Sequence, residues 1–230
     1  MTTIKEKQLH LYEQWKKERN YDDFVYDGIL SYEKWDSIIP KIMFLLKETA
    51  DDFTAIAEKA HDITNGNGTH FWWNICYWKY LIDKLYKNEE AEFIDSSELP
   101  EVKYNNNLLD SIAYVNIKKN CDNNPNSNDS VILDYAKSDQ LFLVQQIDLI
   151  GPDIVFCSNA TFNAYKCIYK EPQLEKLNDI CYKHGNRLIL KFRHPSYFQI
   201  SGGRETNFND LKNALSSDGN ILKQFNWGKS

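Results

Sequence analysis

The residues of this chain best suited to chemistry form the tetrapeptide Arg193-His194-Pro195-Ser196. It directly follows the apolar run 187–192, which has the composition of a buried strand. A histidine at the carboxyl end of such a strand lies at the rim of an open α/β sheet, where ligands bind. Pro195 restricts the backbone and biases His194 away from helix, so the direction of the imidazole is preset. A purely structural histidine is the alternative, and the residues upstream decide between the two.

Composition narrows the class of protein. With 230 residues, 42% of them hydrophobic, the chain can form one domain with a sizeable core. The 27 basic and 33 acidic residues give a net charge of -6, which disfavours nucleic-acid binding by bulk charge but permits a local basic groove. The five cysteines have no Cys-x-x-Cys spacing, and no apolar N-terminal stretch is long enough for a signal peptide or membrane span. We expect a reduced, cytoplasmic protein with no disulfide framework and no structural metal.

Four near-continuous apolar runs alternate with helical patterns. The runs are residues 41–47, 112–117, 153–158 and 187–192. The helical patterns are residues 70–87, 130–150, 161–169 and 206–215. Apolar runs of this kind are typical of strands buried on both faces of a parallel sheet. The pattern predicts an α/β fold, a three-layer αβα sandwich with a central four-stranded parallel sheet, as a single domain over residues 1–230 with an N-terminal helical extension at about 1–37.

Each predicted strand carries a polar group at its carboxyl end. Glu48 follows the first strand, Asn116 ends the second, the third runs into Ser158-Asn159, and His194 follows the fourth. Because the carboxyl ends of parallel strands meet at one edge, we expect a carboxylate, a carboxamide and an imidazole to converge there. The structural alternatives are a helix N-terminal acid for Glu48, a satisfied strand-end amide for Asn116 and a solvated surface pair for Lys118 and Lys119.

The order and spacing of these residues resemble those of the uracil-DNA glycosylase superfamily, most closely its iron–sulfur branch. In that branch an Asn-Val-Val-Lys-Cys motif ends the second strand, and Val115-Asn116-Ile117-Lys118-Lys119 stands there in this chain. A polar loop through Pro125 follows. A helix ending in Gln-Ile-x-x-Ile-x-Pro then leads to a strand and a His-Pro turn, which residues 143–155 and 194–196 match. The resemblance covers about residues 38 to 200.

The chain also departs from the branch it resembles. Of the glycine, acid and proline in the first motif, only the acid remains, as Glu48. Asn120 and Asp139 stand where cluster cysteines would be, so no iron–sulfur cluster and no other cofactor is implied. The segment 157–160 lacks the family's glycine, so uracil specificity is not simply inherited.

The resemblance implies a DNA glycosylase that hydrolyses the N-glycosidic bond of uracil or another modified base flipped out of DNA. In that mechanism His194 donates a hydrogen bond to the departing base, and Glu48, with Asp51 in reserve, serves the sugar cation and the attacking water. Asn116 reads a pyrimidine edge and Phe71 stacks on the base. The other implied substrate contacts are Ser196 and Tyr197, and the implied phosphate contacts are Lys47, Lys118, Lys119, Arg193 and Arg204.

Two other functions stay open. An enzyme of the same fold could act on a free nucleoside or nucleotide, which the acidic net charge would suit, and a non-catalytic nucleic-acid-binding member is the third possibility. The glycosylase interpretation predicts base-modified DNA, single- or double-stranded, as the partner of a monomer that binds no membrane. The identity of the base, and a role in repair or in attack on foreign DNA, stay open.

Overall fold

The four predicted strands form the centre of the sheet in a computed structural model that describes residues 2–49, 70–95, 98, 108–120, 127–197, 203–217 and 219–228. They are β2 (Ile42–Leu46), β3 (Ile112–Asn116), β4 (Ile154–Cys157) and β7 (Arg187–Lys191). β2 pairs in parallel with β3 and with β4, and β4 pairs in parallel with β7. Leu46 lies opposite Asn116, and Cys157 lies opposite Lys191. The carboxyl ends of these strands therefore form one level rim.

The predicted four-stranded parallel sheet is only the centre of the described sheet, which has seven strands and is mixed. β1 (Gly28–Ile29) pairs antiparallel with β3 at one edge. At the other edge β6 (Cys181–His184) pairs antiparallel with β7, and β5 (Glu175–Lys176) pairs antiparallel with β6. β1 and β5 are only two residues long, and β6 is buried fully only at its first residue. Such short edge strands lack the continuous apolar run that marks the central ones.

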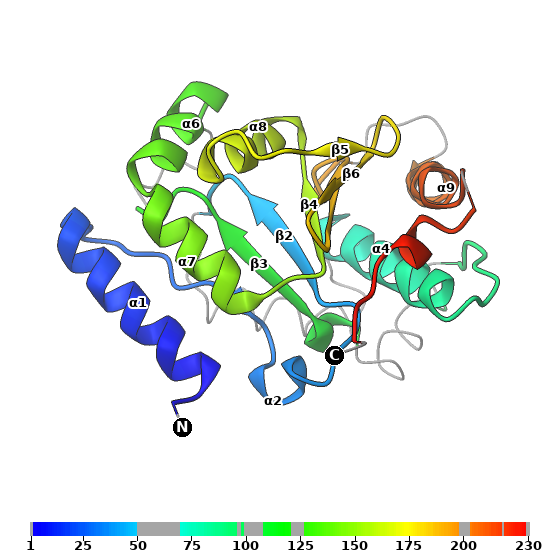
Figure 1. Cartoon of the computed structure of the whole chain (residues 1–230), viewed down its shortest axis with the longest axis horizontal. Coiled ribbons are helices and arrows are strands. Elements are labelled where there is room, and N and C mark those ends of the chain that lie inside the picture. The colour runs from blue at the N-terminus through cyan, green and yellow to red at the C-terminus, as the bar shows by residue number, and fades with distance from the viewer. Residues whose placement is uncertain are drawn as a thin grey trace.

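Helices cover both faces of the sheet, as an α/β fold requires (Figure 1). Ile42, Phe44 and Leu46 of β2 belong to the core under α4 (His70–Tyr86) and α9 (Gly203–Ser216). Met43 and Leu45 belong to the opposite core. That core lies under α1 (Ile4–Arg19), α7 (Gln140–Ile150) and α8 (Asn159–Ile168). The alternation along one strand shows why the run had to be apolar at every position.

The N-terminal segment is part of this architecture and not an appended extension. α1 buries Trp15 completely, and its ring stacks on Phe142 of α7 with the centroids 5.2 Å apart. The short helix α2 (Tyr32–Trp35) buries Trp35. Gly28 adopts a φ of 126°, and a Cβ there would lie 3.0 Å from the Tyr12 hydroxyl, so a glycine is needed where α1 meets β1.

The predicted helix at 130–150 is two helices, α6 (Asp129–Ser138) and α7, which meet at Asp139. Asp139 is fully buried and forms an ion pair with Arg19 at 2.7 Å and accepts a hydrogen bond from Tyr21 at 2.9 Å. These contacts from the N-terminal segment lie at the junction, where the backbone of Asp139 leaves the helical conformation with a φ of −100° and a ψ of 13°. The remaining described elements are the short 3-10 helices η2 (Leu109–Ser111) and η3 (Ile221–Gln224). Within the described ranges, no helix combines the length and apolar character needed to cross a membrane.

Candidate functional site

The turn that carries His194 follows β7 at the rim of the sheet. The backbone N–H of Tyr197 donates to the carbonyl oxygen of His194 at 2.9 Å, which closes the turn. The backbone N–H of Ser196 donates to Nδ1 of His194 at 3.2 Å. Because Nδ1 accepts this bond, the neutral imidazole carries its proton on Nε2. The fold thus presents Nε2–H as a hydrogen-bond donor.

Two of the predicted residues, Phe71 and Lys47, interact with this imidazole. The ring of Phe71, in the first turn of α4, has its centroid 6.0 Å from that of His194. Burial lowers the pKa of His194 below its ordinary value of 6.5, and the ammonium of Lys47 lowers this pKa further. His194 is therefore neutral at pH 7, as a donor to a developing anion should be.

The turn is held from two helices by residues that sequence reasoning missed. Nδ2 of Asn74 in α4 donates to the carbonyl oxygens of Pro195 at 2.6 Å and of Tyr197 at 3.1 Å. Arg193 reaches α9, where Nη1 donates to Asn207 at 3.0 Å and Nη2 pairs with Asp210 at 2.7 Å. An asparagine inside the apolar stretch 71–78 is the sequence signal that could have indicated Asn74.

Glu48 is buried in an ion pair after β2. Its Oε2 accepts from Nζ of Lys118 at 2.9 Å and from Oγ of Ser127 at 2.8 Å, and its Oε1 accepts from the backbone N–H of Ser127. The side chains of Glu48 and Lys118 are 4% and 2% exposed. Lys118 is thus the partner of Glu48 and does not present an exposed ammonium to a phosphate, contrary to the expectation from sequence. Ser127, whose hydroxyl also accepts from Lys118 at 3.2 Å, was not singled out.

Asn116 and Lys119 meet at Asp27, an unpredicted residue. The backbone N–H and Nδ2 of Asn116 donate to Oδ2 of Asp27 at 2.7 and 3.0 Å. Nζ of Lys119 pairs with Oδ1 of Asp27 at 2.5 Å, and Gln146 donates to that oxygen at 2.7 Å. The side chains of Lys119 and Asp27 are 0% exposed. The predicted phosphate contact at Lys119 is therefore replaced by a buried ion pair, and the Asn116 amide is directed to a carboxylate. Its Oδ1 is buried with no partner among the described residues.

The other predicted cations are partly exposed, and two of them are neutralised. Nζ of Lys47 lies 2.7 Å from the carboxylate of Asp129. Arg193 is paired with α9 as described above. Nη2 of Arg204 lies 3.1 Å from Nδ1 of His70, and its guanidinium stacks 5.5 Å from the ring of Trp73.

Ser196 and Tyr197 are exposed beside the turn, and Tyr197 is 45% accessible. Asp51, the reserve carboxylate, lies outside the described residues. Among the residues that the structure describes, no three His, Cys, Asp or Glu side chains gather at a metal-binding distance.

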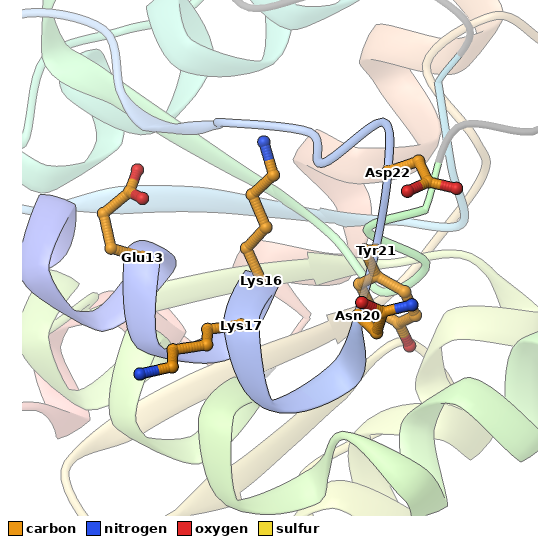
Figure 2. Close-up of a pocket in the computed structure, with 6 residues that line it drawn as sticks. All are labelled: Glu13, Lys16, Lys17, Asn20, Tyr21 and Asp22. Carbon is orange, nitrogen blue, oxygen red and sulfur yellow. The ribbon is translucent and has the colours of Figure 1, made fainter.

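Two open hollows lie away from His194. One is at the end of α1 and is lined by Glu13, Lys16, Lys17, Asn20, Tyr21 and Asp22 (Figure 2). The other is beside the β5–β6 hairpin and is lined by Gln173, Leu174, Glu175, Lys183 and Gly185. Neither hollow is lined by a residue of the predicted site, and in the first Lys16 and Lys17 point in different directions (Figure 2).

Comparison with known proteins leaves the function to be argued from the site itself. No family model, no curated protein and no solved structure matches this chain. The rim offers a neutral Nε2–H donor on His194 beside the aromatic ring of Phe71, and, at the end of β2, a carboxylate on Glu48 whose described contacts are with Lys118 and Ser127 and not with His194. These groups can stabilise a leaving anion, stack on a planar ring and hold positive charge, respectively.

Proposed function

We propose that this chain hydrolyses the N-glycosidic bond of a modified base in DNA, in the manner of the uracil-DNA glycosylase superfamily that its sequence resembles. The observation that carries the proposal is the neutral imidazole of His194, whose Nδ1 is occupied by the Ser196 N–H beside the ring of Phe71. The parallel pairing of β3, β2, β4 and β7 supports it, because the carboxyl ends of parallel strands lie at the same rim.

Cleavage of an N-glycosidic bond leaves an anionic base and a cation-like sugar. Nε2–H of His194 donates to the carbonyl oxygen on which the negative charge develops. One preorganised donor of this kind contributes about 10²- to 10³-fold in rate. Phe71 stacks on the extruded base, which repays part of the cost of unstacking it from the duplex.

Glu48 serves the sugar side of the reaction. Lys118 and Ser127 fix the direction of its carboxylate, so that it can position the attacking water beside the sugar. Asn116 contributes less than the sequence implied, because its Nδ2 is committed to Asp27. Its Oδ1 is buried as well, so Asn116 supports the strand end and does not read the base in this proposal.

A panel of base-modified oligonucleotides, scored for abasic sites, tests the proposal. His194→Ala lowers base release by about 10²-fold or more on the best oligonucleotide while the fold stays intact, because the lost donor acts in the transition state. His10→Ala, at an exposed position of α1, is the matched control and leaves activity unchanged. Full activity in His194→Ala would show that the mechanism is wrong.

A second candidate is an enzyme of the same kind that acts on a free nucleoside or nucleotide. The observation in its favour is the neutralisation of the cations: Lys118 and Lys119 are buried on carboxylates, and Lys47 and Arg193 are paired with Asp129 and Asp210. A long polyanion gains little from such a surface. Free nucleosides and 5′-nucleotides are therefore included in the panel, and base release from these alone would favour the second candidate.

A further inference from the structure

A buried amide of α4 makes its hydrogen bonds to the turn that carries His194. Asn74 is 1% exposed, and its Nδ2 donates to the carbonyl oxygens of Pro195 and Tyr197 at 2.6 and 3.1 Å. A carboxamide nitrogen has two N–H donors, so both are used on this one turn. Its Oδ1 has no hydrogen-bond partner among the described residues, so the described hydrogen bonds of this side chain all go to the turn.

The carbonyl that Asn74 holds belongs to a particular peptide group. The C=O of Pro195 and the N–H of Ser196 lie in one planar peptide unit, and in a trans peptide they point in opposite directions. Fixing the oxygen end therefore fixes the direction of the N–H. That N–H is the one that donates to Nδ1 of His194 at 3.2 Å. Asn74 is thus linked to the imidazole through a single rigid group.

We propose that Asn74 is a positioning residue that sets the tautomer and direction of His194 through the Pro195–Ser196 peptide. With Nδ1 held as an acceptor, the proton stays on Nε2. This inference rests on the proposed function, in which Nε2–H donates to the departing base. Asn207 of α9 plays a weaker part, because its Nδ2 reaches only Tyr197, at 3.4 Å, while its Oδ1 accepts from Arg193.

Two substitutions of Asn74 test this role. Asn74→Asp keeps the shape but removes both donors, and Asn74→Leu replaces the amide with an apolar group of similar size. Both lower kcat by about 10- to 100-fold, the loss expected when a catalytic group is displaced by about 1 Å, with little change in KM because Asn74 does not touch the substrate. Asn207→Asp keeps the acceptor for Arg193 and lowers kcat less.

The matched control is Asn220→Asp. Nδ2 of Asn220 donates to the carbonyl oxygen of Leu85 at 2.6 Å, near the other end of α4. This variant loses a hydrogen bond between an asparagine and a backbone carbonyl but leaves the His194 turn alone. It keeps the wild-type kcat, so a general loss of stability does not account for the effect at Asn74.

A spectroscopic readout separates positioning from stability. The ¹⁵N chemical shifts of His194 report the Nε2–H tautomer in the wild type and in Asn220→Asp, and a mixture of tautomers in the Asn74 variants. Unchanged shifts and kcat in folded Asn74 variants would overturn the inference, while His194→Ala would still decide the proposed function. If His194→Ala is fully active, the proposed function is wrong and the tautomer alone decides the role of Asn74. If both Asn74 variants fail to fold, the ¹⁵N shifts of the wild type decide: a proton on Nε2 supports the inference, and a proton on Nδ1 overturns it, because the Ser196 N–H could then not donate to Nδ1.

Discussion

Replacing Lys119 with methionine distinguishes a buried ion pair from a phosphate contact. The ammonium of Lys119 is 0% exposed, and its counter-charge is Asp27, whose carboxylate also accepts from Gln146 and from two N–H groups of Asn116. Burial lowers the pKa of Lys119, and the Asp27 carboxylate opposes this shift. Lys119→Met keeps most of the aliphatic volume but leaves the Asp27 carboxylate buried without its counter-charge.

The expected loss of folding stability follows from the burial of this ion pair. Removing one partner of a buried ion pair costs about 3 to 5 kcal/mol. Lys119→Met falls at the lower end, because Asp27 keeps its hydrogen bonds to Gln146 and Asn116. Asp27→Asn falls at the upper end, because the Lys119 ammonium then has no counter-charge. For a chain of this size each kcal/mol lowers Tm by about 2 to 4 °C, so we expect losses of about 6 to 20 °C.

The assay is denaturant and thermal unfolding followed by circular dichroism, with Lys17→Met as the control. Lys17 is exposed on α1, and its substitution changes the free energy of unfolding by no more than about 0.5 kcal/mol. The double variant Asp27→Asn with Lys119→Met recovers part of the loss, because both charges are gone. If Lys119→Met unfolds like the wild type and instead lowers the salt dependence of DNA binding by about one phosphate contact, the buried pair is wrong and the sequence-based interpretation is right.

Two further predictions concern pH and the N-terminal segment. The pKa of His194 is lowered and activity needs the neutral imidazole, so kcat/KM is retained as pH falls to 6.5 and is lost only as pH passes through the lowered pKa. Lys47→Gln moves the midpoint of this loss up toward pH 6.5, because the Lys47 ammonium no longer lowers the pKa. A wild-type midpoint at or above 6.5 in the pH–rate profile would contradict the assignment. Trp15→Ala lowers the free energy of unfolding by about 3 to 5 kcal/mol in urea denaturation, since Trp15 is fully buried on Phe142. Deletion of residues 1–37 gives a chain without a cooperative unfolding transition. A deletion variant that melts cooperatively would show that the segment is dispensable.

Local sequence patterns were sufficient to locate the central strands. The runs at 41–47, 112–117, 153–158 and 187–192 are apolar at successive positions because both faces of each strand are buried, and this signal is contained within a few residues. The edge strands were missed because two paired residues leave no period to detect. The β6–β7 hairpin does carry a local signal, since Gly185-Asn186 separates its strands and Gly185 has a φ of 60°.

The positions of the site residues could also be predicted from sequence, but their partners could not. The position of His194 after β7 follows from the Arg193-His194-Pro195-Ser196 turn, and the position of Glu48 follows from the end of β2. The partners of these residues do not follow from sequence. Glu48 and Lys118 are 70 residues apart, and Asn74 and Pro195 are 121 residues apart. The sequence around each of these four residues gives no indication of its partner.

The sequence by itself determined the α/β class, the central strands and the rim at which the imidazole lies, because these depend on local periodicity and turn chemistry. Only the tertiary structure decided that Lys118 and Lys119 are buried on Glu48 and Asp27, and that Asn74 holds the His194 turn. The residues around a lysine that follows a strand look the same whether its side chain is exposed to water or buried in the core. Its charge state, accessibility and partner are set by the segments that fold over it, and those segments come from distant parts of the chain.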